Sequence, residues 1–141
     1  MALSEFNNTA DTTADYDAKD IADNKVYAIF SYLGLLFLVP IFAAPNSKFA
    51  RFHANQGILA CIVVVGYSIV NFLLTFVLGI IFATTNVING VYSHGLIYAL
   101  LTSVLQLVYI IPVVLIIIGI VNAAKGRVKE LPFIGKFRIL K

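Results

Sequence analysis

The sequence has few charged residues, and their distribution is as informative as their number. Asp, Glu, Lys and Arg make up 12% of the 141 residues and hydrophobic residues 60%, whereas a soluble domain has roughly 25% charged residues. Residues 52–124 contain none of the four, a run of 73 residues. This composition excludes an ordinary soluble globule and a disordered or collagen-like chain. We therefore expect an integral membrane protein.

The groupings that support catalysis or metal binding are also missing. The one cysteine, Cys61, cannot form an intramolecular disulfide and has no clustered His or Cys beside it. The sequence shows no nucleophile paired with a base, no carboxylate pair facing a cleft and no glycine-rich phosphate loop. We expect no enzymatic activity, no cofactor and no metal site.

The hydrophobic pattern predicts an all-α fold with three transmembrane helices. Acidic residues 1–22 are expected to form a flexible tail, residues 23–124 the transmembrane domain, and residues 125–141 a basic, amphipathic tail on the membrane surface. Residues 84–95 are predicted to form a turn-rich connection. The three spans are placed at about residues 26–43, 57–83 and 96–123.

Capping residues and prolines refine these boundaries. Asp23 or Asn24 can cap the first helix, and Asn46 or Ser47 can cap the second. Pro40 is expected to kink or end the first span.

The distribution of basic residues predicts the topology. Residues 1–25 hold six acidic and two basic residues, the loop after the first span holds Lys48 and Arg51, and the C-terminal tail holds six basic residues against Glu130. Because basic segments remain in the cytoplasm, three spans place the N-terminus outside and the C-terminus in the cytoplasm of a bacterial plasma membrane. Lys19 and Lys25 near the first span leave a slipped or re-entrant first helix open.

The most distinctive segment is FARFHANQG at residues 49–57. On a helix, Arg51 and Asn55 stack four residues apart. One interpretation is a cytoplasmic interaction motif for lipid headgroups, a peptide or another subunit; the other is an interface anchor, in which Phe rings lie at headgroup level and Arg51 reaches phosphate. The residues of the predicted motif are Phe49, Arg51, Phe52, His53, Asn55 and Gln56.

This segment, followed by an apolar span, resembles the signature of small bacterial membrane proteins, mostly a domain of unknown function. They are related to the roughly twenty-kilodalton channel-like component of the chloroplast inner-envelope translocon. Residues 23–26 and 126–132 also resemble the bacterial branch, so the resemblance covers about residues 20–141. It implies a helical membrane bundle and a translocon-like role. The plastid members have four helices, whereas three are predicted here.

Polar residues recur at helical spacing within the predicted spans. Ser68, Asn71 and Thr75 share one face of the second helix, and Gln106 lies on the third. Such a stripe packs helices inside a bundle or between copies of the chain. If several copies assemble, the same residues could instead line a pore or small-solute channel. The absence of charge in the second and third helices weighs against an ion relay.

The C-terminal tail interleaves apolar and basic residues, and Pro132 and Gly135 prevent one uninterrupted helix. Because this tail follows a span, we expect it to bind anionic lipid headgroups rather than nucleic acid. The predicted headgroup contacts are Lys125, Arg127, Lys129, Lys136, Arg138 and Lys141.

These features predict a non-enzymatic membrane component: an assembly, scaffold or translocation-associated subunit that acts through helix contacts and a basic cytoplasmic surface. Its expected partners are anionic lipids and either further copies of the chain or another membrane protein. An oligomeric channel and a lipid-interacting envelope protein are the alternatives.

Overall fold

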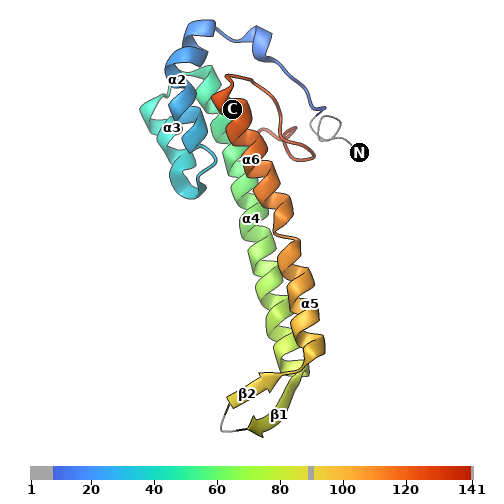
Figure 1. Cartoon of the computed structure of the whole chain (residues 1–141). Coiled ribbons are helices and arrows are strands. Elements are labelled where there is room, and N and C mark those ends of the chain that lie inside the picture. The colour runs from blue at the N-terminus through green and yellow to red at the C-terminus, as the bar shows by residue number, and fades with distance from the viewer. Residues whose placement is uncertain (1–7, 89–90, 141) are drawn as a thin grey trace. The chain divides into compact units, whose positions relative to one another are not determined.

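The structure is a computed structural model that describes residues 8–88 and 91–140. It is predominantly helical (Figure 1) and divides into two compact units. The terminal unit comprises Met1–Val63 and Pro112–Lys141, and the hairpin unit comprises Val64–Ile111.

The terminal unit begins with short helices. These are η1 (Thr13–Asp15), α2 (Ala18–Phe30), η2 (Gly34–Phe37) and α3 (Leu38–Ala43). The Asp17 side chain caps α2 by accepting a hydrogen bond from the Lys19 backbone N–H at 2.8 Å. The helix therefore starts before the predicted caps Asp23 and Asn24.

The predicted first span, residues 26–43, is not one helix. α2 ends at Phe30, and Gly34 adopts a φ of 60°, which favours glycine and redirects the chain before η2. α3 then covers six residues. Two longer helical stretches in the described part of the chain are long and apolar enough to cross a membrane, namely Lys48–Ile81 and Leu96–Ala124.

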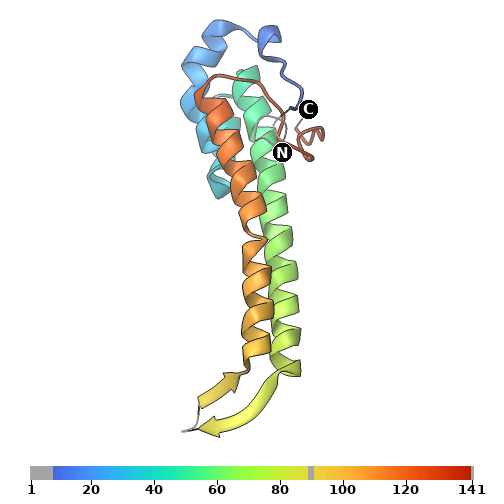
Figure 2. The ribbon, with the colours of Figure 1, turned by 45° about the vertical axis from the view of Figure 1, so that its right-hand side comes forward.

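The core of the terminal unit joins α2 to the first turns of α4 (Lys48–Ile81) and the last turns of α6 (Ile110–Ala124). Two glycines permit close approach: a Cβ on Gly57 would lie 1.8 Å from the Ser31 carbonyl oxygen, and one on Gly119 would lie 2.1 Å from the Tyr32 ring. Figure 2 shows α4 and α6 running side by side within this unit. The buried residues that form this core cluster are Ala28, Tyr32, Phe49, Phe52, Ala60, Ala123, Val128 and Leu131.

The hairpin unit contains the rest of α4, β1 (Ala83–Ile88), β2 (Val91–His94) and α5 (Leu96–Leu107). β1 and β2 are antiparallel, with Ala83 opposite His94. The helical class is as predicted, but a small hairpin occupies the predicted connection, where β-branched residues around the dipeptide Asn89 and Gly90 are a hairpin signal. These two residues lie outside the described part of the chain.

The predicted third span is divided into α5 and α6. Pro112 has no N–H to donate to the Val108 carbonyl four residues earlier, and that carbonyl accepts from the Ile111 N–H at 3.1 Å instead. The Tyr67 hydroxyl on α4 also donates to the Leu105 carbonyl near the break. The break therefore has a local cause in the sequence.

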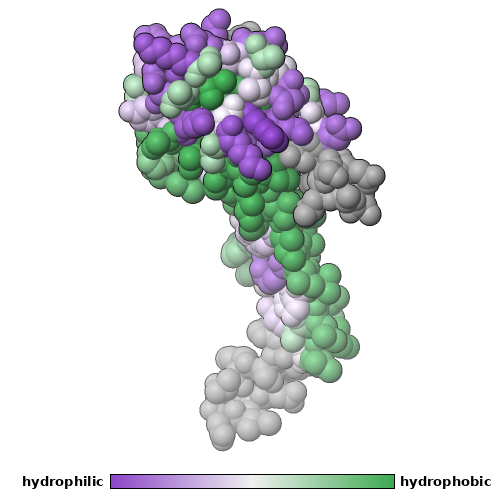
Figure 3. All heavy atoms as spheres, turned by 45° about the horizontal axis from the view of Figure 1, so that its top comes forward, coloured by the Kyte–Doolittle hydropathy of each residue, from purple (hydrophilic) through white to green (hydrophobic). Residues whose placement is uncertain are grey.

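Large apolar side chains lie exposed along both long helical stretches. On α4, Phe72 is 67% exposed and Ile80 64% exposed. Figure 3 shows green, hydrophobic residues over the helices and purple, hydrophilic residues gathered on the terminal unit. An apolar surface of this kind suits contact with lipid rather than water.

Candidate functional site

The predicted interaction motif occupies the first turns of α4, and side chains from two segments hold the start of that helix. The Ser47 hydroxyl accepts from the Ala50 N–H at 2.9 Å, which confirms Ser47 as a cap. The Asp20 carboxylate on α2 accepts from the Phe49 N–H at 3.0 Å. A carboxylate at this end also interacts favourably with the positive end of the helix dipole. Sequence reasoning missed Asp20, because nothing local indicates a partner 29 residues away.

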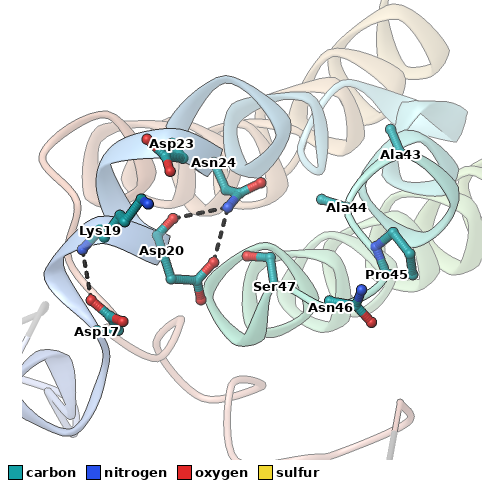
Figure 4. A pocket seen from close by; sticks show the side chains of 10 residues that line it. All are labelled: Asp17, Lys19, Asp20, Asp23, Asn24, Ala43, Ala44, Pro45, Asn46 and Ser47. Carbon is teal, nitrogen blue, oxygen red and sulfur yellow. Dashed lines mark hydrogen bonds between the residues drawn. The ribbon is translucent and has the colours of Figure 1, made fainter.

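A pocket of about 380 Å³ lies beside this cap. Figure 4 shows Asp20 reaching from α2 toward the start of α4, with Asn24 donating to its carboxylate. Within the described residues, no group of three or more His, Cys, Asp or Glu could hold a metal ion. The pocket is lined by Asp17, Lys19, Asp20, Asp23, Asn24, Ala43, Ala44, Pro45, Asn46 and Ser47.

His53 is fully buried, and both of its ring nitrogens have partners. Its Nε2 lies 3.1 Å from the Arg127 carbonyl oxygen, and its Nδ1 lies 2.9 Å from the Tyr32 hydroxyl. Because a carbonyl only accepts, we assign the proton to Nε2, so that Nδ1 of the neutral ring accepts from Tyr32. Phe49 and Phe52 pack edge-on against the ring, at centroid distances of 4.7 and 5.2 Å. His53 thus connects α4 to the turn after α2 and to the segment after α6.

Asn55 binds the backbone of the C-terminal loop, which we define as residues 131–140. Its Nδ2 donates to the Phe137 carbonyl at 2.8 Å. Its Oδ1 accepts from the N–H groups of Ile139 and Leu140, at 2.6 and 3.0 Å.

Gln56 binds the same loop nearer its beginning. Its Nε2 donates to the Gly135 carbonyl at 2.9 Å, and its Oε1 accepts from the Leu131 N–H at 3.1 Å. A carboxamide offers a donor and an acceptor together, so it can replace the pairing that backbone finds in a sheet. We call Asn55 and Gln56 the amide clamp. Its five hydrogen bonds hold a loop that has no regular secondary structure of its own.

The structure thus places most of the predicted motif inside the protein. Phe49, Phe52, His53, Asn55 and Gln56 are buried, and Arg51 is exposed. The side chains of His53, Asn55 and Gln56 hydrogen-bond to other parts of the same chain. A role for these six residues in binding an outside partner stays a prediction.

The N-terminal segment pairs with the segment after α6. The Thr12 N–H donates to the Val128 carbonyl at 2.9 Å, and the Glu130 N–H donates to the Ala10 carbonyl at 3.1 Å. Asp11 and Lys129 face each other in an antiparallel bridge. These contacts join the N-terminal segment to the segment after α6 within the terminal unit, and the number of spans and their orientation stay predictions.

Two side chains in the paired region have shifted pKa values. The Thr13 hydroxyl and N–H both donate to the Asp11 carboxylate, and these hydrogen bonds lower the pKa of Asp11. Burial raises the pKa of Tyr16, whose ring packs edge-on against Phe52 at 6.3 Å. The described part of the predicted flexible tail therefore has specific contacts.

The predicted lipid-contacting residues differ in their surroundings. Arg138 forms an ion pair with Glu130 at 2.7 Å, and its guanidinium carbon lies 5.3 Å from the centre of the Phe52 ring. Lys129 is partly buried beside Asp11. Lys141 lies outside the described residues. The other three basic residues are all exposed, namely Lys125, Arg127 and Lys136.

The predicted polar stripe lies in the hairpin unit. Ser68 Oγ donates to the Val64 carbonyl at 2.7 Å and lies 2.5 Å from the Tyr109 hydroxyl. Asn71 Oδ1 and Thr75 Oγ1 are buried and have no hydrogen-bond partner among the described residues. Gln106 is exposed. The structure thus engages Ser68 and leaves two polar atoms of the stripe unsatisfied.

The long apolar helices, the uncharged run and the hydrogen-bonded terminal unit together define a helical membrane protein. The chain belongs to the MamF/MmsF family, the magnetosome magnetite crystal formation protein family, whose model matches residues 23–138. No curated protein and no solved structure matches the chain.

The family assignment corrects the resemblance drawn from the sequence. The chain was expected to resemble bacterial relatives of a chloroplast translocon component, and this expectation is wrong. The segment that suggested it, residues 49–57, lies inside the residues that the MamF/MmsF model matches. A translocon-like role therefore has no support.

Proposed function

We propose that this protein is a non-enzymatic membrane component, an assembly or scaffold subunit that serves the crystal-forming membrane for which its family is named. The observation that carries the proposal is how the terminal unit uses its polar groups. His53, Asn55 and Gln56 all bind the chain's own backbone, and no side chain of this cluster is left to act on a substrate. Such a unit suits a stable platform on the membrane.

In the proposed topology the membrane is crossed twice, by α4 and by the α5–α6 stretch. This topology puts both terminal segments on one face and the β1–β2 connection on the other, and the hydrogen bonds between residues 10–12 and 128–130 support it. Lys48, Arg51 and the basic tail all fall on the cytoplasmic face, which agrees with the positive-inside rule. The alternative is the three-span topology with the N-terminus outside.

Helix contacts are the proposed means of assembly. Asn71 Oδ1 and Thr75 Oγ1 lack partners within the described chain, and unsatisfied polar atoms in a lipid environment favour a neighbouring helix that supplies a donor. A second copy of this chain is the simplest source of such a helix. A different membrane protein could supply the same groups.

In-membrane crosslinking tests this proposal. A photoreactive group at exposed Gln106 should give one discrete product, either a homo-oligomer or a complex with one stoichiometric partner, and Asn71→Leu should weaken it. Phe72→Leu, at a lipid-exposed neighbour, is the matched control and should leave the product unchanged. A protein that stays monomeric and partner-free in native membranes contradicts the proposal.

A channel is the second candidate, supported by the same unpartnered atoms. In an oligomer, Ser68, Asn71, Thr75 and Gln106 would line the pore. Reconstituted liposomes distinguish the two functions: solute flux that Asn71→Leu abolishes without loss of folding supports the channel. Absence of flux at every oligomer size removes it.

A further inference from the structure

We propose that the C-terminal loop is a membrane anchor that inserts Phe133 and Phe137 into the headgroup region of an anionic lipid leaflet. The inference rests on the proposed function in one respect, namely that α4 crosses the membrane.

The apolar residues of the loop differ in exposure: some are buried in the core and others are exposed to the surroundings. Leu131 is 1% exposed and belongs to the core, whereas Phe133 is 77% exposed and Phe137 is 64% exposed. Phe133 also has a φ of 63°, the left-handed region that bulky residues rarely adopt. The fold therefore accepts an unfavourable backbone conformation at the residue whose ring it leaves most exposed in this loop.

The amide clamp fixes the backbone that carries these two rings. Gln56 binds the backbone of Leu131 and Gly135, and Asn55 binds the Phe137 carbonyl. Gly135 fits tightly, because a Cβ there would lie 2.4 Å from the Leu131 nitrogen. Both rings therefore extend from a preformed loop, which reduces the entropy lost on binding.

The clamp also sets the depth of the loop. Asn55 and Gln56 lie near the beginning of α4, immediately before its apolar stretch, which begins at about Gly57. Figures 1 and 2 both show the chain after α6 folding back beside the first turns of α4. The loop consequently lies level with the end of the hydrocarbon core, where exposed aromatic rings are favoured.

The exposed charges favour a lipid leaflet over a protein groove as the partner. Lys136 is exposed between the two Phe residues, and Lys125 and Arg127 are exposed just after α6. Glu130, the acidic residue near the loop, is already paired with Arg138. Exposed basic residues in the same unit as the two exposed aromatic rings match an anionic membrane surface.

Single-tryptophan variants test the anchor, because the natural sequence has no Trp. The full chain carrying Phe133→Trp or Phe137→Trp is reconstituted in vesicles of phosphatidylglycerol and phosphatidylcholine. We expect blue-shifted emission, quenching by lipids brominated near the headgroup, and loss of quenching by aqueous iodide. Phe72→Trp, in the apolar part of α4, reports the span itself and should be quenched by lipids brominated deep in the chains.

Further variants test separately the contribution of the amide clamp and that of the basic charge. Gln56→Leu in the Phe133→Trp background should restore iodide quenching. Lys136→Glu should reduce lipid quenching more in anionic than in neutral vesicles.

The outcomes separate the anchor from the proposed function. In one outcome, brominated lipid quenches the Phe72→Trp variant, but the two loop variants are quenched by iodide. In another, brominated lipid again quenches the Phe72→Trp variant, but the two loop variants are quenched by neither lipid nor iodide, because a protein surface covers them. Either outcome contradicts the proposed membrane anchor and leaves the proposal that α4 crosses the membrane intact. If the Phe72→Trp variant also escapes lipid quenching, the membrane-spanning proposal fails first.

Discussion

Asn55 and Gln56 show how two buried amides can organise a segment that has no regular structure. Each bonds backbone groups of residues 131–140, and the Leu131 N–H that Gln56 binds is buried. A buried amide is costly when unpaired, so the loop and the clamp depend on each other.

The first prediction removes one arm of the clamp. Gln56→Leu keeps a similar volume but leaves the buried Leu131 N–H without its partner, at a cost of roughly 1–3 kcal/mol, whereas the Gly135 carbonyl keeps its hydrogen bond from Arg138. We expect lower stability in detergent micelles and faster hydrogen exchange at the Leu131 amide. Gln106→Leu, the same change at an exposed position, is the control and should affect neither. Unchanged exchange at Leu131 would show that Gln56 does not hold the loop.

A second residue-scale prediction concerns close packing. In Gly57→Ala the added methyl group would lie 1.8 Å from the Ser31 carbonyl oxygen, so α2 and α4 must separate, at a cost of roughly 1–3 kcal/mol. Gly66→Ala, on the same helix, meets no atom within 4 Å and should be neutral or stabilising. Thermal unfolding in micelles measures both, and equal effects would argue against the Gly57 contact.

The sequence was informative about residues only where their partners are near in the chain. Ser47 could be recognised as a cap because it bonds Ala50, three residues on. Residues 49–57 stood out as unusual, yet nothing local indicates that Gln56 binds residues 75 and 79 positions away. Such pairings depend on tertiary folding, which composition and periodicity do not describe.

At the scale of elements, hydrophobicity predicted the two long apolar stretches but not how the chain breaks. The stretch at 26–43 is apolar enough to suggest a span, yet it is divided into short helices: Gly34 adopts a positive φ after α2 ends, and Pro40 lies within the six-residue α3. In the third predicted span, Pro112 separates α5 from α6. An averaged hydropathy does not register a single residue that lacks an N–H or adopts a positive φ.

The start of α4 yields an element-scale prediction. Ser47→Ala removes the side-chain acceptor for the Ala50 N–H and should cost about 1 kcal/mol. Asn46→Ala, at the exposed preceding residue, should change stability little. Chemical unfolding in micelles compares the two, and a larger loss for Asn46→Ala would mean that the cap is wrongly assigned.

At the scale of the whole molecule, the paired terminal segments support the proposed two-span topology. Charge counting placed acidic and basic ends on opposite faces, but acidic residues have little influence on insertion. The hydrogen bonds from Thr12 to Val128 and from Glu130 to Ala10 favour the proposal that both terminal segments lie on one face of the membrane. With two spans, all the basic segments still lie on the cytoplasmic side.

Cysteine accessibility tests this topology most directly. In a Cys61→Ala background, single cysteines replace Ala14, Gly95 and Lys136, which are all exposed, and intact cells are treated with a membrane-impermeant maleimide. The two-span account predicts that Gly95→Cys reacts in intact cells, and that Ala14→Cys and Lys136→Cys react only after permeabilisation. Reaction of Ala14→Cys in intact cells while Lys136→Cys stays protected would place the termini on opposite faces and contradict it.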